Sequence, residues 1–344
     1  MLGRVVRLAC AAVLLTVGTT GLARADQIAQ AKRIADEFAA PRYAALARAT
    51  AEQATMWTAL CAAPTPDTTT TLRAAFTKAV LAWEDIALLR TGPIAEDNRL
   101  ERLSYWPDKR NITDKRLREL LGGNDPVPDI AAMAGKSVAV QGFHALERVL
   151  FADGPPALET PDGARRCAVG ALIARNIAAI AGEVDAPWQD ATSALRVGLT
   201  DKEGVETFLR RAATDLIAGY EILIDDKIRQ AIGREADAAR PLSAEFRRSG
   251  LSLPAIRQNI ASLRALTAVM FAGTDDENAD ATAAEALKLA NGASDNAPQA
   301  TDDPSARTKM LLLVAALTSA RDIAKEVVPD VLGVTIGFNS ADGD

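Results

Sequence analysis

The chain has 344 residues, of which 49% are hydrophobic and 24% are charged, and its formal net charge is −6. This composition is that of a globular protein and excludes collagen-like, disordered and polytopic membrane proteins. The negative charge argues against nucleic acid as a partner, and the length predicts one large domain or two modest ones.

The first 25 residues have the pattern of a secretory signal peptide. Arg4 and Arg7 precede an apolar run, and Ala23-Arg24-Ala25 forms a cleavage site before Asp26. Removing this segment takes away three arginines and no acids, so the mature chain carries 36 basic and 45 acidic side chains. No later uninterrupted apolar run approaches the roughly 18 residues that cross a bilayer. We therefore expect an exported protein that is soluble after cleavage behind Ala25.

Two cysteines, Cys61 and Cys167, remain in the mature chain. In an oxidising compartment such a pair most simply forms a disulfide. This bond would close a loop of about 100 residues and stabilise the protein by about 4–5 kcal/mol. Two buried free thiols are the alternative.

Almost every periodic stretch has apolar residues three and four positions apart, which predicts an all-α fold. The first mature helix should break near Pro41, after which helical spacing continues to Cys61. A turn is expected at 64–67. The next helix spans about Thr71 to Arg90 and stops before Gly92-Pro93.

The segment 91–111 is predicted to be a long irregular connection, and such loops tend to carry function. Helices are then expected from Ser137 to Phe151 and from about Pro161 to Gly182. A change in composition over 185–200 marks a domain boundary. We place it so that residues 26–190 form an N-terminal helical bundle and residues 191–344 a C-terminal one.

The second half opens with the capping pattern Thr200-Asp201-Lys202-Glu203 and a long amphipathic helix that ends at Gly233. Further helices are predicted to start at Ser252, to run from Glu277 to Leu289, and to begin at Asp303-Pro304. The core face of the last helix is expected to consist of Leu311, Leu312, Val314, Leu317 and Ile323. Two antiparallel helical bundles explain these elements most simply, and a single elongated bundle is the alternative.

The chain has one histidine, His144, and it falls within an expected helix. Glu147 follows three positions later, so the imidazole and the carboxylate can bind one ion or hydrogen-bond to each other. Gly142 is unusual there, because glycine costs about 0.5–1 kcal/mol in a helix interior unless another backbone or a ligand comes close. A core histidine that is satisfied by the glutamate is the alternative interpretation.

A single histidine excludes the two-histidine zinc motif of metallopeptidases and the paired Glu-x-x-His sites of di-iron bundles. A metal site would need oxygen ligands from elsewhere, and carboxylates with one imidazole suit iron or manganese. The candidates for these oxygen ligands are Glu84, Asp85, Asp108, Asp342 and Asp344. The alternative for each of them is an ordinary solvated acid at the surface.

The sequence resembles the imelysin family of secreted bacterial proteins, which includes the iron-regulated protein A group. The resemblance rests first on Gly142-x-His144-x-x-Glu147, which matches the Gly-x-His-x-x-Glu signature of the family. Other landmarks occur in order over nearly the whole mature chain: Leu60-Cys61, Trp83, Arg90-x-Gly92-Pro93, Trp106-Pro107-Asp108, Arg166-Cys167, Gly337-Phe338-Asn339 and Asp342-Gly343-Asp344.

Membership would imply a periplasmic or surface-exposed protein of two helical bundles, with the His-x-x-Glu helix near a cleft between them. It would also imply metal binding or a part in iron acquisition. His144 and Glu147 match the signature and are therefore candidate metal ligands, and Glu84, from the acids named above, is the third candidate. Four further residues are expected to line the cleft, or else to serve packing, turns and ion pairing: Gly142, Arg90, Trp106 and Asp108.

We therefore predict a periplasmic protein that binds a metal, with iron as the first candidate. The protein would take part in the uptake or sensing of this metal, and catalysis is not required. Its expected partners are the metal ion or an iron carrier, together with an iron permease or an outer-membrane receptor. One alternative is a metal-dependent peptidase with Glu147 as general base. Another is a protein-interaction module in which His144 and Glu147 only order the helix.

Overall fold

The computed structural model describes residues 26–122, 126–151, 157–158, 160–272, 278–293, 297–298 and 303–336. This described part contains helices, turns and irregular segments but no strand, so the all-α prediction is confirmed. The predicted signal peptide and the candidate ligands Asp342 and Asp344 lie outside the described residues.

The α-helices are α2 (Ala40–Ala62), α3 (Pro66–Glu84), α4 (Arg99–Leu103), α5 (Ile112–Gly122), α6 (Ile130–Met133), α7 (Phe143–Phe151), α8 (Ala164–Gln189), α9 (Ala194–Gly198), α10 (Lys202–Glu221), α11 (Gln230–Ile232), α12 (Ser252–Met270), α13 (Asn278–Gly292) and α14 (Pro304–Leu332). Two π-helical stretches are η1 (Ile34–Ala39) and η5 (Ile222–Arg229). Short 3₁₀ turns are η2 (Gly92–Ala95), η3 (Val138–Val140), η4 (Pro161–Gly163), η6 (Ala236–Ala238) and η7 (Pro241–Ser243).

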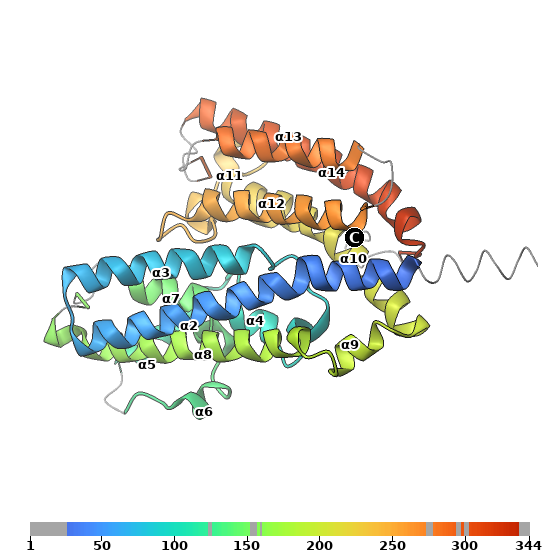
Figure 1. The fold of residues 1–344 in the computed structure, drawn as a ribbon. Helices are drawn as coiled ribbons and strands as arrows, with labels where there is room; N and C mark the ends of the chain where they lie inside the picture. Colours follow the sequence, from blue (N-terminus) through green and yellow to red (C-terminus); the bar gives the residue numbers. More distant parts are fainter. Residues whose placement is uncertain are drawn as a thin grey trace, which may run out of the picture.

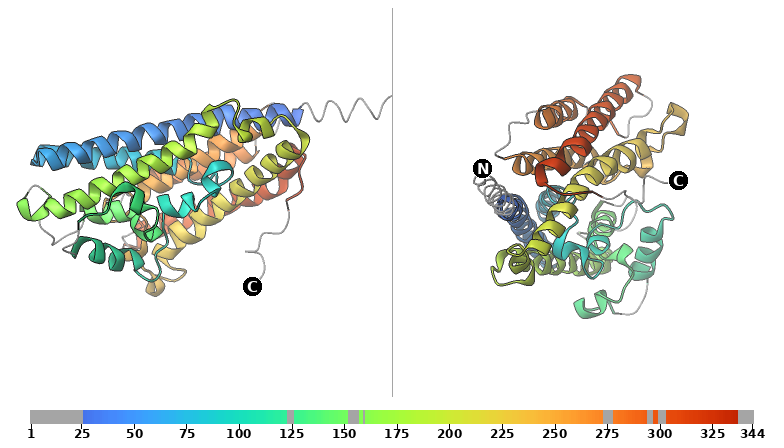
Figure 2. Two further views of the ribbon diagram at one scale, coloured as in Figure 1. Left: turned by 90° about the horizontal axis from the view of Figure 1, so that it is seen from below. Right: turned by 90° about the vertical axis from the view of Figure 1, so that its right-hand side faces the viewer.

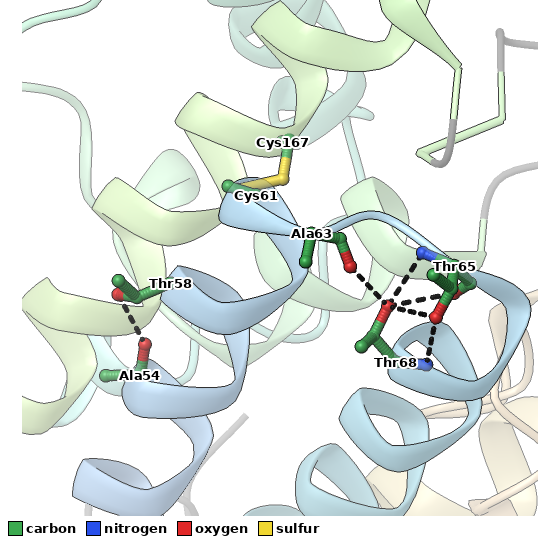
Figure 3. The surroundings of a disulfide bond; sticks show 7 residues. All are labelled: Ala54, Thr58, Cys61, Ala63, Thr65, Thr68 and Cys167. Carbon is green, nitrogen blue, oxygen red and sulfur yellow. Dashed lines mark hydrogen bonds between the residues drawn. A yellow bond between two sulfur atoms is a disulfide. The ribbon is translucent and has the colours of Figure 1, made fainter.

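In the first half of the chain, α2 packs along both α3 and α8 (Figure 1). A disulfide between Cys61 and Cys167 joins the end of α2 to the first turn of α8, which confirms the predicted pair (Figure 3). The buried Trp57 of α2 lies against Gly170 of α8, where an added Cβ would be 2.2 Å from the indole ring. A glycine at this position therefore makes room for a large core side chain.

The break predicted near Pro41 is wrong, because the chain is helical from residue 26 to Ala62. Pro41 lies in the first turn of α2, directly after the π-helical stretch η1. Proline lacks a backbone N–H and clashes with the preceding turn of a regular α-helix. The wider π-helical turn accommodates that defect without ending the helix.

The turn predicted at 64–67 is confirmed in its first half, because residues 63–65 connect α2 to α3. Its second half is already helical: α3 begins at Pro66, before the predicted start at Thr71, and ends at Glu84. Thr65 caps this helix: its side chain accepts a hydrogen bond from the backbone N–H of Thr68, and Thr68 Oγ1 accepts one from the N–H of Thr65 (Figure 3). Proline is tolerated at the first helical position because its missing N–H would have no partner there. The capping box therefore turns a Pro-rich stretch into a helix start.

In the second half, the short helix α9 is followed by a long helix that continues through α10, η5 and α11 and ends at Gly233, as its periodicity predicts. Its cap is Asp201, whose side chain accepts from the N–H of Gly204. Helices α12, α13 and α14 follow, and α14 contacts both α13 and α10. The axes of the long helices in both halves are roughly parallel or antiparallel to one another (Figures 1 and 2).

The two halves are joined where α12 contacts the C-terminal end of α3. Asn259 Nδ2 donates to the Glu84 carbonyl at 2.7 Å, and Ser262 Oγ donates to the Asp85 carbonyl at 2.5 Å. The Asp85 side chain accepts from Gln258 and pairs with Arg42. The bonds from Asn259 and Ser262 satisfy carbonyl groups at the end of α3 that have no partner within the helix.

The core face predicted for the last helix is wrong in part. Leu313 and Leu317 are buried, whereas Leu311 is 43% exposed and Leu312 is 54% exposed. Three consecutive leucines span 200° of a helix, so they cannot all face one core. Only the third member of the run points inward.

Helix α8 extends to Gln189, seven residues beyond the predicted end, and contains Pro187. It is the one helix in the described part of the chain that is long and apolar enough to cross a membrane, although most of its apolar stretch is buried inside the protein. The core face of α8 includes Leu172, Ile173 and Ile177. The division at 190/191 into two bundles with a cleft between them stays a prediction.

Candidate functional site

The site is organised around the short helix α7, which carries His144 and Glu147 and is buried over most of its length. The chain enters α7 through Gly142. A Cβ added there would be 2.1 Å from the carbonyl oxygen of Leu103 and 2.5 Å from that of Arg102. No side chain fits in this space, so the glycine allows two backbone segments to touch. The contact sets the start of α7 against the segment that leads to Ser104.

The helix predicted from Ser137 to Phe151 is in two parts. Residues Val138–Val140 form a 3₁₀ turn, and the α-helix begins only at Phe143. Between them, the Gln141 carbonyl accepts a hydrogen bond from Asn176 Nδ2 of α8 at 2.9 Å. This side chain satisfies a buried backbone group that lies outside the helical ladder.

His144 is only 3% exposed, and residues from two other segments contact its ring. Its Nε2 lies 3.0 Å from Ser104 Oγ and 3.3 Å from Glu245 Oε1. The ring of Phe246 stacks on the imidazole with a centroid separation of 4.6 Å. The serine, the carboxylate and the stacked ring together fix the orientation of the imidazole.

Glu245 connects His144 to a buried ion pair in the core. Lys227 Nζ lies 2.6 Å from Glu245 Oε2 and 2.5 Å from Glu84 Oε2. All three side chains are almost completely buried. The second oxygen of Glu84, Oε1, has no hydrogen-bond partner in the described structure. We call these four residues, His144, Glu245, Lys227 and Glu84, the buried charge chain.

One ammonium group serves two carboxylates, and the pKa values of the two carboxyls diverge. Burial raises the pKa of Glu84 to about 7, and the negative charge of Glu245 adds to this effect against the opposing attraction of Lys227. Burial also acts to raise the pKa of Glu245, but Lys227 and the hydrogen bond from His144 outweigh it and hold the value at about 2. The low-dielectric surroundings thus disfavour a second negative charge beside one lysine.

Glu147, the second motif residue, faces a different partner. Its Oε1 accepts hydrogen bonds from the backbone N–H of Ser249 at 2.9 Å and from Ser249 Oγ at 2.8 Å. Ser249 belongs to the segment between α11 and α12 that also carries Glu245 and Phe246. The His-x-x-Glu motif therefore holds this later segment at two points.

A second cluster of charges surrounds Arg148, the residue after Glu147. Arg148 lies 2.5 Å from Asp114 Oδ1 and 3.7 Å from Asp108 Oδ2. Both oxygens of Asp108 accept backbone N–H groups at 2.8 Å, from Ile112 and Thr113, at the start of α5. Burial acts to raise the pKa of Asp108, and these bonds and Arg148 outweigh it, so the pKa is lowered.

Two pockets meet at Trp106. One, of about 130 Å³, is lined by Trp106 and Ser104 together with Arg90, Lys227 and Glu245. The other, of about 70 Å³, is lined by Trp106, Asp108, His144, Glu147 and Arg148. The indole of Trp106 lies 6.4 Å from the His144 ring.

The predicted site residues therefore fall into separate places. His144, Glu147, Trp106 and Asp108 line one pocket, whereas Arg90 lines the neighbouring pocket. Glu84 reaches His144 only through Lys227 and Glu245, and Gly142 serves a backbone contact. Asp85 is engaged by Arg42 and Gln258.

Within the described residues, no group of three or more His, Cys, Asp or Glu side chains is placed to hold a metal ion. Between Glu84 and Glu245 the positive charge is supplied by Lys227. His144 and Glu147 line one pocket but give at most two ligands. A bound metal would thus take further ligands from water or from a second molecule.

Five residues of the site were not predicted from the sequence: Lys227, Glu245, Ser249, Ser104 and Phe246. Lys227 did carry a signal, because a lysine on the apolar face of a helix that also presents Leu223 and Ile224 is a candidate for a buried ion pair. Glu245 and Ser249 lie in an irregular segment without periodicity, so nothing in the sequence distinguishes them from surface residues.

The imelysin family model, Peptidase_M75, matches residues 39–324. No curated protein matches the chain significantly.

Two solved structures share the fold. An imelysin-like protein from Psychrobacter arcticum 273-4 has a TM-score of 0.73 at 20% identity, over 91% of this chain and 97% of the other. A protein described as an iron-regulated protein A precursor, from Parabacteroides distasonis ATCC 8503, has a TM-score of 0.68 at 16% identity, over 88% of this chain and 95% of the other. With a family match that extends from the η1–α2 helix into α14, the chain belongs to the imelysin family.

Proposed function

We propose that this protein binds a metal ion as cargo outside the cytoplasm, with iron as the first candidate. We also propose that it takes part in iron uptake or sensing. The observation that carries the proposal is the pocket shared by His144 and Glu147, the two motif residues. An imidazole and a carboxylate that line one pocket are a ligand pair that suits iron, manganese or zinc.

The fixed orientation of the imidazole supports this proposal. Ser104 and Glu245 both lie within 3.3 Å of His144 Nε2. Carboxylates that hydrogen-bond a metal-binding histidine typically set the direction of its ring and raise its basicity. Glu84 is linked to this carboxylate through Lys227, so we assign it a positioning role behind His144 and Glu245.

The disulfide supports a place outside the cytoplasm. Cys61 and Cys167 are bonded to each other, and such bonds persist in oxidising compartments. Together with the signal-peptide pattern of residues 1–25, this favours the periplasm. We expect the partners to be an iron carrier that delivers the ion and an iron permease or outer-membrane receptor.

The test is the metal content of the mature protein, purified from the periplasm without a histidine tag, because a tag would bind metal itself. His144→Ala and Glu147→Gln are compared with the wild type, and Glu52→Gln is the matched glutamate control because Glu52 pairs with Lys78 at the surface. We expect bound metal in the wild type and in Glu52→Gln and its loss in both site variants, with the helical circular dichroism spectrum retained.

A wild-type protein that holds no metal after titration with iron, zinc and manganese would overturn the proposal. Metal that persists in both site variants would equally remove His144 and Glu147 from it. Retention in Glu147→Gln alone would restrict the ligand role to His144, because the glutamine can still accept the bonds from Ser249.

A further inference from the structure

A broad groove lies beside the pocket of His144, and cationic side chains line it. Its volume is about 700 Å³, and it shares Asp108, Arg148 and Arg248 with the smaller pocket. Its charged lining consists of two acids, Asp108 and Asp114, and of the cations Lys109, Arg148, Arg240, Arg247 and Arg248. This concentration of positive charge contrasts with the net charge of −6 of the whole chain. We call it the arginine groove.

The two acids of the groove are already engaged. Both oxygens of Asp108 accept backbone N–H groups at 2.8 Å. The Asp114 carboxylate lies 2.5 Å from Arg148 and 3.7 Å from Arg248. The lining itself therefore holds five cations and two carboxylates. Glu147 also acts on Arg247, and Lys109 on Asp226, so the excess of positive charge is smaller than the lining alone suggests, but cations still outnumber acids.

The guanidinium of Arg247 is held in place among these cations. Burial lowers its pKa, and the neighbouring Arg248 and Arg148 lower it further, against the opposite effect of Glu147 and Asp114. Its Nε donates to the Leu242 carbonyl at 2.9 Å, which fixes the plane of the group. A fixed guanidinium loses little side-chain freedom when it pairs with an anion.

We propose that the arginine groove binds a small polyanion, that is, a ligand with two or more carboxylate or phosphate groups. Guanidinium groups bind such oxyanions through paired N–H···O bonds, and several of them around one hollow favour a ligand with more than one charge. A hollow of this volume is in the range of small-molecule sites. The inference goes beyond the proposed metal binding and stands without it.

The experiment is isothermal titration calorimetry of the metal-free full chain with citrate and with pyrophosphate, at about 50 mM and about 300 mM salt. We expect binding that weakens at the higher salt concentration, because the groove is open to solvent. Replacing Arg240 and Arg247 together by glutamine should weaken it at least about tenfold, since both charge-assisted pairs with the oxyanion are then lost. Arg321→Gln, on α14 beside Asp322, is the matched arginine control.

The two ligands separate the two sources of the oxyanion: binding of citrate alone indicates a polycarboxylate, and binding of pyrophosphate alone indicates a phosphate compound. Variant His144→Ala separates this inference from the proposed function, because it removes a proposed metal ligand and leaves all five cations in place. We expect it to bind the polyanion with the affinity of the wild type.

The proposal is overturned if neither ligand binds at low salt, or if the double variant Arg240→Gln/Arg247→Gln binds as tightly as Arg321→Gln. It is also overturned if only a polyglutamate peptide binds, since the groove would then serve a macromolecular partner. Circular dichroism and thermal unfolding of each variant show that a loss of binding is not a loss of fold.

Discussion

The buried charge chain and the arginine groove both contact α7, but burial gives them different properties. Lys227, Glu245 and Glu84 are at most 6% exposed, and one ammonium serves two carboxyls, so burial raises the pKa of Glu84 to about 7 and disfavours its charged form. In the groove, the Arg248 side chain is 24% exposed and that of Asp114 is 29% exposed. Water and salt screen such groups, so the groove can hold unmatched charge that the core cannot. The buried charge chain fixes the fold around His144, whereas the arginine groove keeps cations that a ligand can contact.

The sharpest test of this contrast is the removal of the shared ammonium. Lys227→Met leaves Glu84 and Glu245 buried without their counter-charge, so we expect the free energy of unfolding to fall by about 3–5 kcal/mol. Urea denaturation followed by circular dichroism measures the loss. Arg248→Met, which removes a groove cation, should cost less than about 1 kcal/mol. Equal losses in the two variants would contradict the contrast.

A second test addresses the backbone contact that sets the start of α7. In Gly142→Ala, the new Cβ would overlap the carbonyl oxygens of Leu103 and Arg102. The segments must then move apart, and we expect a loss of about 2–3 kcal/mol. Gly182→Ala is the matched control, because nothing lies within 4 Å of a Cβ at that helical position. It should be neutral or stabilising, and thermal unfolding compares the two.

The third test uses pH. Because the pKa of Glu84 is raised to about 7 in the folded protein, the folded state keeps a proton that the unfolded state releases near pH 4.5. This contribution to stability is complete below about pH 4.5 and is lost as the pH rises through 7. We expect Glu84→Gln to flatten the decline of stability between pH 5 and pH 8 by about 1–2 kcal/mol. Urea denaturation across this range measures the slope.

Asp215 supplies the control for the pH test. Burial raises its pKa to about 7 as well, although its Oδ2 accepts the backbone N–H of Arg90. Asp215→Asn should flatten the same pH interval independently, and the double variant should show the sum of the two effects. A wild-type stability that stays constant between pH 5 and pH 8 would contradict the raised pKa values.

Most features that the sequence could predict depend on residues close to one another in the chain. Local signals predicted the helix that begins beside Asp201, the helix that begins after Asp303 and the disulfide. A glycine inside an expected helix, Gly142, indicated that another backbone or a ligand comes close, and the backbone of residues 102–103 does so. The helix break predicted at Pro41 is wrong, because the helix continues past this proline through a π-helical turn.

The remaining site residues depend on contacts between distant segments. Ser249 and Glu147 are separated by 102 positions, and Lys227 and Glu84 by 143. No local periodicity reports such a pairing, and the segment that carries Glu245 has none. The motif residues could be found from spacing, whereas the partners that orient them required the fold.

The smallest expected effect on stability belongs to Asp114, the acid that pairs with Arg148 and Arg248. Asp114→Asn removes one negative charge from an open groove, so we expect the free energy of unfolding to change by less than about 1 kcal/mol. The affinity for citrate or pyrophosphate should instead rise about three- to tenfold, because both guanidinium groups become available to the ligand. Calorimetry at low salt measures the affinity, and Asp322→Asn beside Arg321 is the matched control. Tighter polyanion binding without a change in stability is the behaviour of a screened, ligand-binding cluster, whereas a large loss of stability would assign Asp114 and its arginines to the fold.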